Sequence, residues 1–96
     1  MPIRSYRDRD TERLAKGEHV SAFHGFQRQA EKSLRRLEAA TCLGDLAALS
    51  GNRLERLQGD HEGPHSIRIN DQWRICFVWN DAEHGAEQVE ITKHDR

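Results

Sequence analysis

The sequence has no long apolar run and no apolar export signal at its start. Only 35% of its 96 residues are hydrophobic, whereas 32% are charged. No segment approaches the roughly 18 consecutive apolar residues that are needed to cross a membrane. The first residues, MPIRSYRDRD, contain no apolar stretch of the kind that directs secretion. We therefore expect a cytoplasmic protein that does not enter the membrane.

Cysteine is also scarce. The two cysteines, Cys42 and Cys76, are 34 positions apart and form no CxxC motif, the spacing that is typical of zinc and redox sites. In a reducing compartment such residues are most often small buried hydrophobic side chains. Internal repeats, low-complexity segments and linkers are absent from the sequence as well. We therefore expect a single domain over residues 1–96.

A strong excess of positive charge is missing from the chain as a whole. The net charge is −1, and the isoelectric point is near 6.6, which argues against a strong binder of nucleic acid that ignores sequence. The charge is unevenly distributed, however. Residues 1–40 hold nine Lys/Arg against six Asp/Glu, a net charge of +3, whereas residues 41–96 hold six against ten, a net charge of −4.

The first half of the chain has the pattern of helices. Asp8 or Asp10 can cap a short helix that runs to about Lys16 and stops at Gly17. Ser21 is the expected cap of a longer helix with one apolar stripe. The stripe residues recur at spacings of 3, 4, 4 and 3 and are Phe23, Phe26, Ala30, Leu34 and Leu37.

The second half has the pattern of an antiparallel sheet. It follows a brief helical turn in LGDLAALSG, for which Asp45 is the expected cap. A tight turn at Asn70 and Asp71 is expected to join two of the strands, because both residue types tolerate a positive φ. The third strand is apolar on both faces, as expected of a central strand covered by a helix. The predicted fold class is α+β, with strands at 53–57, 66–69, 73–79 and 86–92.

Three segments, in order along the chain, carry a family resemblance. They are IRSYRDRDTERLAKG at 3–17, GNRLERLQGDHEGPHSIRINDQWRICFVW at 51–79 and VEIT at 89–92. Together they resemble the HigB branch of the RelE/ParE superfamily of bacterial toxins. The resemblance implies a RelE-like fold, in which two N-terminal helices pack on a curved antiparallel sheet. It also implies a ribosome-dependent endoribonuclease that cleaves mRNA and uses no cofactor or metal. A HigA-like helix-turn-helix antitoxin would hold this enzyme inactive, and the toxin would contact DNA only indirectly, through that antitoxin.

Two other kinds of function stay open from the sequence. A toxin similar to the ParE branch has the same architecture but poisons DNA gyrase by contact, and a third possibility is a pure interaction module. A cationic cleft together with a proton-transfer group near the last strand would favour the enzyme. The residues TKH at 92–94 supply such a group.

Arg74 is the leading candidate for a catalytic residue. It lies in the apolar segment WRICFVW, cannot lose its charge, and would cost about 3–5 kcal/mol if it were buried without a partner. We expect its side chain on the open face of the sheet, with Trp73 and Ile75 pointing into the core. There it can stabilise the negative charge that develops on phosphorus when RNA is cleaved. The alternatives are that it extends to solvent from a half-covered strand or pairs with a glutamate such as Glu90.

Other cations are candidates for binding RNA. Arg68 has a corresponding place on the partner strand, where it either joins Arg74 in an anion seat or faces bulk solvent. A basic row on the long helix, where like charges four residues apart slightly destabilise the helix, is a candidate for contact with ribosomal RNA. It consists of Arg28, Lys32, Arg35 and Arg36. Such rows are also common as simple solvated faces.

The C-terminal segment departs from the family pattern. HigB relatives commonly end their last strand with Asp-Tyr-His and carry a histidine in the first strand, whereas this chain ends VEITKHDR and has Glu55 there. His94 is then the candidate for proton transfer at neutral pH. Lys93 is a candidate for offsetting charge, and Glu55, on a neighbouring strand, for the base that accepts the 2′-hydroxyl proton. The alternative is a solvated C-terminus without a chemical role.

The remaining histidines and tryptophans have simpler interpretations. His61 and His65 are four residues apart, but Gly63 and Pro64 place them in a loop, and no third ligand is near in sequence, so no metal site is expected. A loop histidine beside the cleft has a possible stacking role on RNA, with a surface role as the alternative. The two tryptophans, Trp73 and Trp79, are expected in the core.

Overall fold

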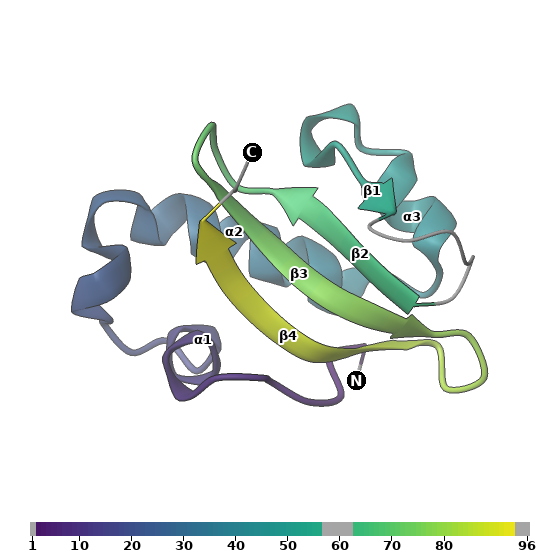
Figure 1. Cartoon of the computed structure of the whole chain (residues 1–96), viewed down its shortest axis with the longest axis horizontal. Helices are drawn as coiled ribbons and strands as arrows, with labels where there is room; N and C mark the ends of the chain where they lie inside the picture. Colours follow the sequence, from purple (N-terminus) through teal and green to yellow (C-terminus); the bar gives the residue numbers. More distant parts are fainter. Residues whose placement is uncertain (1, 57–62, 94–96) are drawn as a thin grey trace.

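The computed structural model describes residues 2–56 and 63–93. Three α-helices come first, followed by a four-stranded antiparallel sheet with the strand order β1-β2-β3-β4, which confirms the predicted α+β class (Figure 1). The arrangement differs from the two N-terminal helices that the resemblance implies, because a third, short helix forms at the helical turn expected in LGDLAALSG. The helices are α1 (Arg9–Ala15), α2 (Gln27–Ala39) and α3 (Leu43–Ala47), and the strands are β1 (Glu55–Arg56), β2 (Gly63–Arg68), β3 (Trp73–Asn80) and β4 (Gly85–Lys93).

Helix α1 begins and ends at the residues that the sequence indicates. Asp8 is the N-cap, and its carboxylate accepts a hydrogen bond from the Thr11 backbone amide at 3.0 Å. At the other end, Gly17 has a φ of 92°, a left-handed conformation that glycine adopts without steric cost. The Glu18 amide then donates to the Arg13 carbonyl at 3.1 Å, which closes the helix end.

The segment before α2 differs from the prediction. Residues Ser21–Phe26 form a 3-10 helix whose N-cap is Val20, and Ser21 caps nothing. The backbone departs from helical geometry at Phe23, and the regular helix α2 starts only at Gln27. The predicted apolar stripe is confirmed nonetheless, because Phe23, Ala30, Leu34 and Leu37 are buried and Phe26 packs against them.

Asp45 also has a different place from the one predicted. Helix α3 starts after Cys42, and Asp45 lies in its first turn rather than at the cap. Its carboxylate reaches back and accepts hydrogen bonds from the Thr41 amide and hydroxyl, both at 2.8 Å. These hydrogen bonds stabilise the ionised form and hold the pKa of Asp45 below its usual value.

The β2–β3 connection falls where the sequence predicts it, by another mechanism. Neither Asn70 nor Asp71 has a positive φ. Instead the Asn70 side-chain oxygen accepts hydrogen bonds from the backbone amides of Gln72, at 2.8 Å, and Trp73, at 2.9 Å. The cross-strand pairs that follow run from Arg68 opposite Arg74 to Gly63 opposite Trp79.

Strand β4 is irregular in a way that the sequence did not reveal. The pairing with β3 shifts between Cys76 and Val78, and Gln88 lies in this bulge with a φ of 53°. The extra residue keeps Ala86 on the same buried face as Val89 and Ile91. The N-terminal segment covers the outer edge of β4, with bridges from Ile3 to Ala86 and from Tyr6 to Val89, so this edge is not free to pair with another chain.

The core lies between α2 and one face of the sheet (Figure 1). Trp79 is almost fully buried and Trp73 stacks on Phe26 with ring centroids 4.6 Å apart, which confirms both as core residues. His65 is a correction. It is not a loop residue, because β2 begins at Gly63, and it is buried and stacked on Phe77. His61 lies outside the described residues.

Within residues 2–56 and 63–93, no helix is long and apolar enough to cross a membrane.

Candidate functional site

The face of the sheet that points away from α2 carries a set of polar side chains. Residues paired across an antiparallel sheet lie on the same face, and the pairing places Glu55, Ser66, Cys76 and Glu90 in one row across all four strands. The next row consists of Arg68, Arg74 and Thr92. In Figure 1 this face is turned toward the viewer, and no helix of the described chain lies over it. We call these seven residues the polar face.

Arg74 lies on this face, as expected, but it is not exposed as expected. Only 8% of its side chain is accessible, and its guanidinium is held by other groups of the chain. Nε donates to the Ser66 hydroxyl at 2.8 Å, and Nη2 donates to the Arg53 carbonyl at 2.7 Å. A buried guanidinium is tolerated when its donors are satisfied in this way.

Within the described part of the chain, Glu55 is the acidic residue that pairs with Arg74. One of its carboxylate oxygens lies 3.8 Å from Nη2, and 54% of the Glu55 side chain is accessible. The glutamate that the sequence suggested, Glu90, instead pairs with Arg7 at 3.3 Å. Because Glu55 is distant and hydrated, it neutralises Arg74 only weakly. The polar face therefore keeps a cation at its centre.

Arg68 shares the face with Arg74 rather than pointing to the opposite side. The two residues form a cross-strand pair of β2 and β3. The Arg68 guanidinium forms an ion pair with Asp71 in the connection that follows. Arg68 and Arg74 thus form the predicted pair of cations on one face, although each already has partners within the chain.

Cys76 and Glu90 are members of the polar face that the sequence reasoning missed as site residues. They are a cross-strand pair, and Arg7 reaches Glu90 from the N-terminal segment. Burial and the negative charge of Glu90 raise the pKa of the Cys76 thiol. Strand alternation from Arg74 would have identified Cys76, but the partners on β1 and β4 depend on pairing and on a bulge that the sequence does not signal.

The C-terminal candidates are only partly joined to this face. Lys93 pairs with Trp73, so the alternation of β4 directs it to the opposite face from Thr92 and Arg74. His94 lies outside the described residues. Glu55 is not on a neighbour of β4, as predicted, because β1 and β4 are the two edges of the sheet. Three strand spacings of about 4.8 Å separate them, roughly 14 Å.

The cations of α2 belong to another surface. Helix α2 covers the face of the sheet opposite Arg74 (Figure 1), so its basic row does not converge on the polar face. Arg28, Lys32 and Arg35 are exposed, whereas Arg36 is half-buried and donates to the Asn52 side chain at 3.4 Å. The row is therefore split, with three solvated cations and one that is partly structural.

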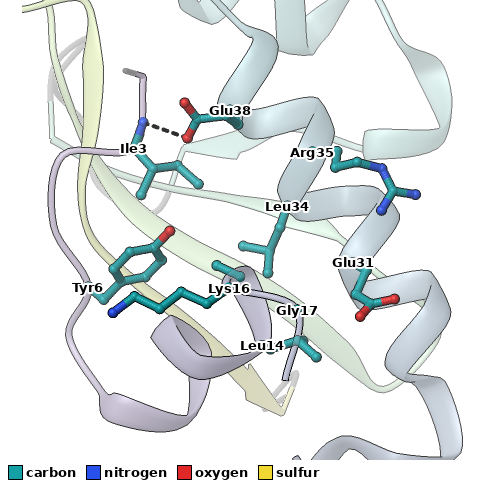
Figure 2. A pocket seen from close by; sticks show the side chains of 10 residues that line it. Ile3, Tyr6, Leu14, Lys16, Gly17, Glu31, Leu34, Arg35 and Glu38 are labelled. Atoms are coloured by element: carbon teal, nitrogen blue, oxygen red, sulfur yellow. Dashed lines mark hydrogen bonds between the residues drawn. The ribbon is translucent and has the colours of Figure 1, made fainter. Parts of the chain in front are cut away.

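A groove lies between α1 and α2. Its volume is about 450 Å³, and its lining includes Ile3, Leu14 and Leu34 together with Lys16, Glu31, Arg35 and Glu38. Figure 2 shows Tyr6 at one end, beside Lys16. Burial and the charges of Glu38 and Glu12 raise the pKa of Tyr6. This groove shares no lining residue with the polar face.

Among residues 2–56 and 63–93, no group of three or more His, Cys, Asp or Glu side chains is arranged to hold a metal ion.

Comparison with known proteins identifies the family. The family described as "RelE-like toxin of type II toxin-antitoxin system HigB" matches residues 3–91, a range that includes every described residue of the polar face except Thr92. The chain is also 44% identical over 50 residues to Toxin HigB-1 of Vibrio cholerae serotype O1, an alignment that covers 52% of this chain and 53% of that protein. The chain thus spans about half the length of this curated relative. On the extent of the family match, the chain belongs to the HigB family of RelE-like toxins of type II toxin-antitoxin systems.

Proposed function

We propose that this chain is the toxin of a type II toxin-antitoxin system and acts as a ribosome-dependent endoribonuclease that cleaves mRNA. The observation that carries the proposal is Arg74, a fixed cation on the uncovered face of the sheet, beside a second arginine and a carboxylate. Family membership supports the same reaction class. The RelE-like arrangement, with the helices on one face, leaves the other face available to a strand of RNA.

The chemistry that this face can support is attack of a ribose 2′-hydroxyl on the adjacent phosphorus. The bond from phosphorus to the 5′-oxygen breaks, which leaves a 2′,3′-cyclic phosphate and a 5′-hydroxyl. Negative charge grows on the phosphoryl oxygens, and a preorganised guanidinium stabilises it without having to reorganise. Arg74 supplies that charge, and Arg68 adds a second cation on the neighbouring strand.

Proton transfer is assigned to Glu55 and His94. Glu55, at the β1 edge, accepts the 2′-hydroxyl proton, and His94, the residue after β4, gives a proton to the leaving 5′-oxygen. The attacking and leaving oxygens lie on opposite sides of phosphorus, so the reaction needs a base and an acid as two separate groups. Lys93 is assigned no role in this step, because it lies on the opposite face of β4 from Thr92 and Arg74.

Contacts with the ribosome are assigned to the basic row of α2. Arg28, Lys32 and Arg35 are exposed, and Arg36 adds its charge from the half-buried end of the row. Because this row lies on the opposite side of the sheet from Arg74, the two surfaces can contact ribosomal RNA and mRNA at the same time. Contacts of this kind with phosphates weaken as salt concentration rises.

The partner in the resting cell is a HigA-like helix-turn-helix antitoxin. Family membership implies an antitoxin partner. We assign DNA binding to that antitoxin and not to this chain, whose single domain, residues 1–96, acts in the cytoplasm, where ribosomes and mRNA are found. Neither a cofactor nor a metal ion is part of the proposed mechanism.

The proposal is tested by adding the purified chain to a translation reaction that contains one defined mRNA. Primer extension should then reveal cuts within codons at the ribosomal A site, and the same mRNA without ribosomes should remain intact. Cuts in naked RNA would contradict ribosome dependence. If the mRNA stays intact in both reactions and the chain inhibits DNA supercoiling by purified gyrase, the protein is a gyrase poison instead.

A further inference from the structure

The polar groups that hold Arg74 in place suggest a role beyond stability. We propose that Ser66 and the backbone carbonyl of Arg53 are positioning residues, which orient the Arg74 guanidinium so that its Nη1 group is presented to RNA. This inference rests on the proposed function, because it explains how the central cation of the polar face is kept ready.

The geometry of the guanidinium separates a held side from a presented side. Arginine has five N–H donors, one on Nε and two on each terminal nitrogen. Nε donates to the Ser66 hydroxyl at 2.8 Å, and Nη2 donates to the Arg53 carbonyl at 2.7 Å and lies 3.4 Å from the Ser66 carbonyl. No acceptor within residues 2–56 and 63–93 takes a hydrogen bond from Nη1, so its two N–H groups are left for a phosphate.

Ser66 is specialised for this contact by its location. It is fully buried on the polar face of β2, with Glu55 on one side and Cys76 on the other. A buried hydroxyl costs free energy unless it is hydrogen-bonded, and in this case its partner is the Arg74 side chain on the adjacent strand. An alanine at this position would retain the fold of the strand but would leave Nε without its acceptor.

Arg53 contributes through its backbone, which is strained. Its φ is 46°, a left-handed conformation that is uncommon for a residue other than glycine. Arg53 lies between Asn52 and β1, and its carbonyl accepts the hydrogen bond from Nη2 of Arg74. Asn52 is itself anchored, because it is fully buried and donates to the Leu46 carbonyl at 3.1 Å. Strain that persists beside a cation of a candidate site suggests a functional constraint rather than a defect.

Two neighbouring elements thus fix one side chain from two directions. Ser66 holds Nε from β2, and the turn before β1 holds Nη2. Such support matters because a displacement of about 1 Å in a reacting group can lower a rate by about 10²-fold. If the same contacts served stability alone, their loss would weaken folding and leave the activity of each folded molecule unchanged.

The test compares Ser66→Ala and Ser66→Thr with the wild-type chain in two measurements. The first is the hydrogen exchange of the Arg74 Nε–H group, observed by NMR and assigned by its absence in Arg74→Lys. The second is single-turnover cleavage on programmed ribosomes, with ribosome affinity measured separately. Ser33→Ala is the matched control, because Ser33 is also a buried serine but lies in α2.

We expect Ser66→Ala to speed Nε–H exchange and to lower the cleavage rate by about 10- to 100-fold at unchanged ribosome affinity. Ser66→Thr, which keeps the hydroxyl, should recover most of that rate, and Ser33→Ala should have neither effect. In an Arg74→Lys background, Ser66→Ala should have little further effect, because Ser66 acts through Arg74. Two further variants test the backbone conformation at Arg53. Arg53→Gly permits the positive φ and should still cleave mRNA, whereas Arg53→Pro forbids it and should lose cleavage.

Three results would overturn the inference. Unchanged Nε–H exchange in Ser66→Ala would mean that the hydrogen bond does not hold Arg74. Faster exchange with an unchanged cleavage rate would mean that the contact serves the fold alone. If Ser66→Ala lowers the cleavage rate by the same factor in the Arg74→Lys background as in the wild-type chain, Ser66 acts by another route. A wild-type chain that cuts no mRNA would instead refute the proposed function itself, which separates that failure from the first three.

Discussion

The two faces of the β-sheet are made by the same strands but perform different tasks. Along β3, Ile75, Phe77 and Trp79 are buried against the helical side, whereas Arg74 and Cys76 alternate with them on the polar face. The helical side excludes water with apolar side chains, which provides most of the driving force for folding. On the polar face, the groups are arranged by hydrogen bonds and charge. Neighbouring residues of one strand therefore contribute to different properties, one to the stability of the fold and the next to the proposed chemistry.

The comparison also shows that a face without a helix can still bury a charge. Arg74 is as inaccessible as many core residues, and its guanidinium contacts the Ser66 hydroxyl on β2 and the Arg53 carbonyl just before β1. The apolar side chains of the helical face need only to fit in shape. Each donor of Arg74, in contrast, requires a partner in a definite direction. The polar face is thus the more sensitive of the two to small displacements.

The largest effect is expected on the helical side, where Ile75→Ala should lower the free energy of unfolding by about 2–5 kcal/mol. Ile75 is fully buried, so the substitution leaves a cavity. Val78→Ala, on the opposite face and half-buried, is the control and should cost less. Urea denaturation followed by circular dichroism measures both. Equal losses would mean that the two faces contribute alike to stability.

A smaller but purely functional effect is expected from His94→Ala. It should lower single-turnover cleavage on programmed ribosomes by about 10²-fold or more, because a positioned acid typically contributes that much, and it should leave ribosome binding intact. The comparison is a binding measurement on the same variant. If cleavage is unchanged, proton transfer belongs to another group, and if only binding is lost, His94 is a docking residue.

Glu55→Gln should reduce cleavage by about 10²-fold while leaving stability nearly unchanged. The proposed base is lost, but its weak, hydrated pairing with Arg74 contributes little to folding. Glu83→Gln is a matched control, since Glu83 has the same exposed side-chain fraction, 54%, and lies in a distant turn. Thermal unfolding and single-turnover rates measure the two effects. A loss of stability without loss of rate would assign Glu55 to structure.

The smallest expected effect concerns the reaction rates of the two thiols. The expected burial of both cysteines is wrong for Cys42, which is exposed, whereas Cys76 is half-buried on the polar face. Burial and the charge of Glu90 raise the pKa of the Cys76 thiol. Because the thiolate is the reactive form, Cys76 should react with a disulfide reagent at least about 10-fold more slowly than Cys42 at pH 8. Glu90→Gln should bring the two reaction rates closer together, because it removes a charge that raises the pKa of Cys76. Equal rates in the wild-type chain would contradict the described burial.

The elements that could be predicted from the sequence are those with local signals. Asp8 and Gly17 define α1, and the apolar stripe of α2 follows from helical spacing. Ser21 and Asp45 were placed wrongly because a capping residue type does not determine which backbone amide it reaches. The brief helical turn expected in LGDLAALSG corresponds to α3, whereas the 3-10 segment before α2 depends on tertiary packing, which residue spacing does not encode.

The candidate site was predictable only in part, for a related reason. Arg74 stands out because a permanent charge in an apolar strand is unusual, and Arg68 follows from the hairpin. The groups that hold Arg74 do not stand out. Ser66 is an ordinary strand residue in the sequence. Arg53 acts through its backbone carbonyl and its positive φ, and the residue type indicates neither of these. Contacts between strands are set by pairing, so only the folded sheet reveals them.

The central claim is that Arg74 performs the chemistry of the polar face, and single-turnover cleavage by Arg74→Ala tests it most directly. The matched control is Arg13→Ala, which removes an ion-paired arginine from α1. Both variants are first compared with the wild-type chain by circular dichroism, and rates are expressed per folded molecule. The account predicts a 10²–10³-fold lower rate for Arg74→Ala, the usual effect of removing one contact that stabilises charge in the transition state, and an unchanged rate for the control. A folded Arg74→Ala protein that cuts mRNA at the wild-type rate would contradict the claim.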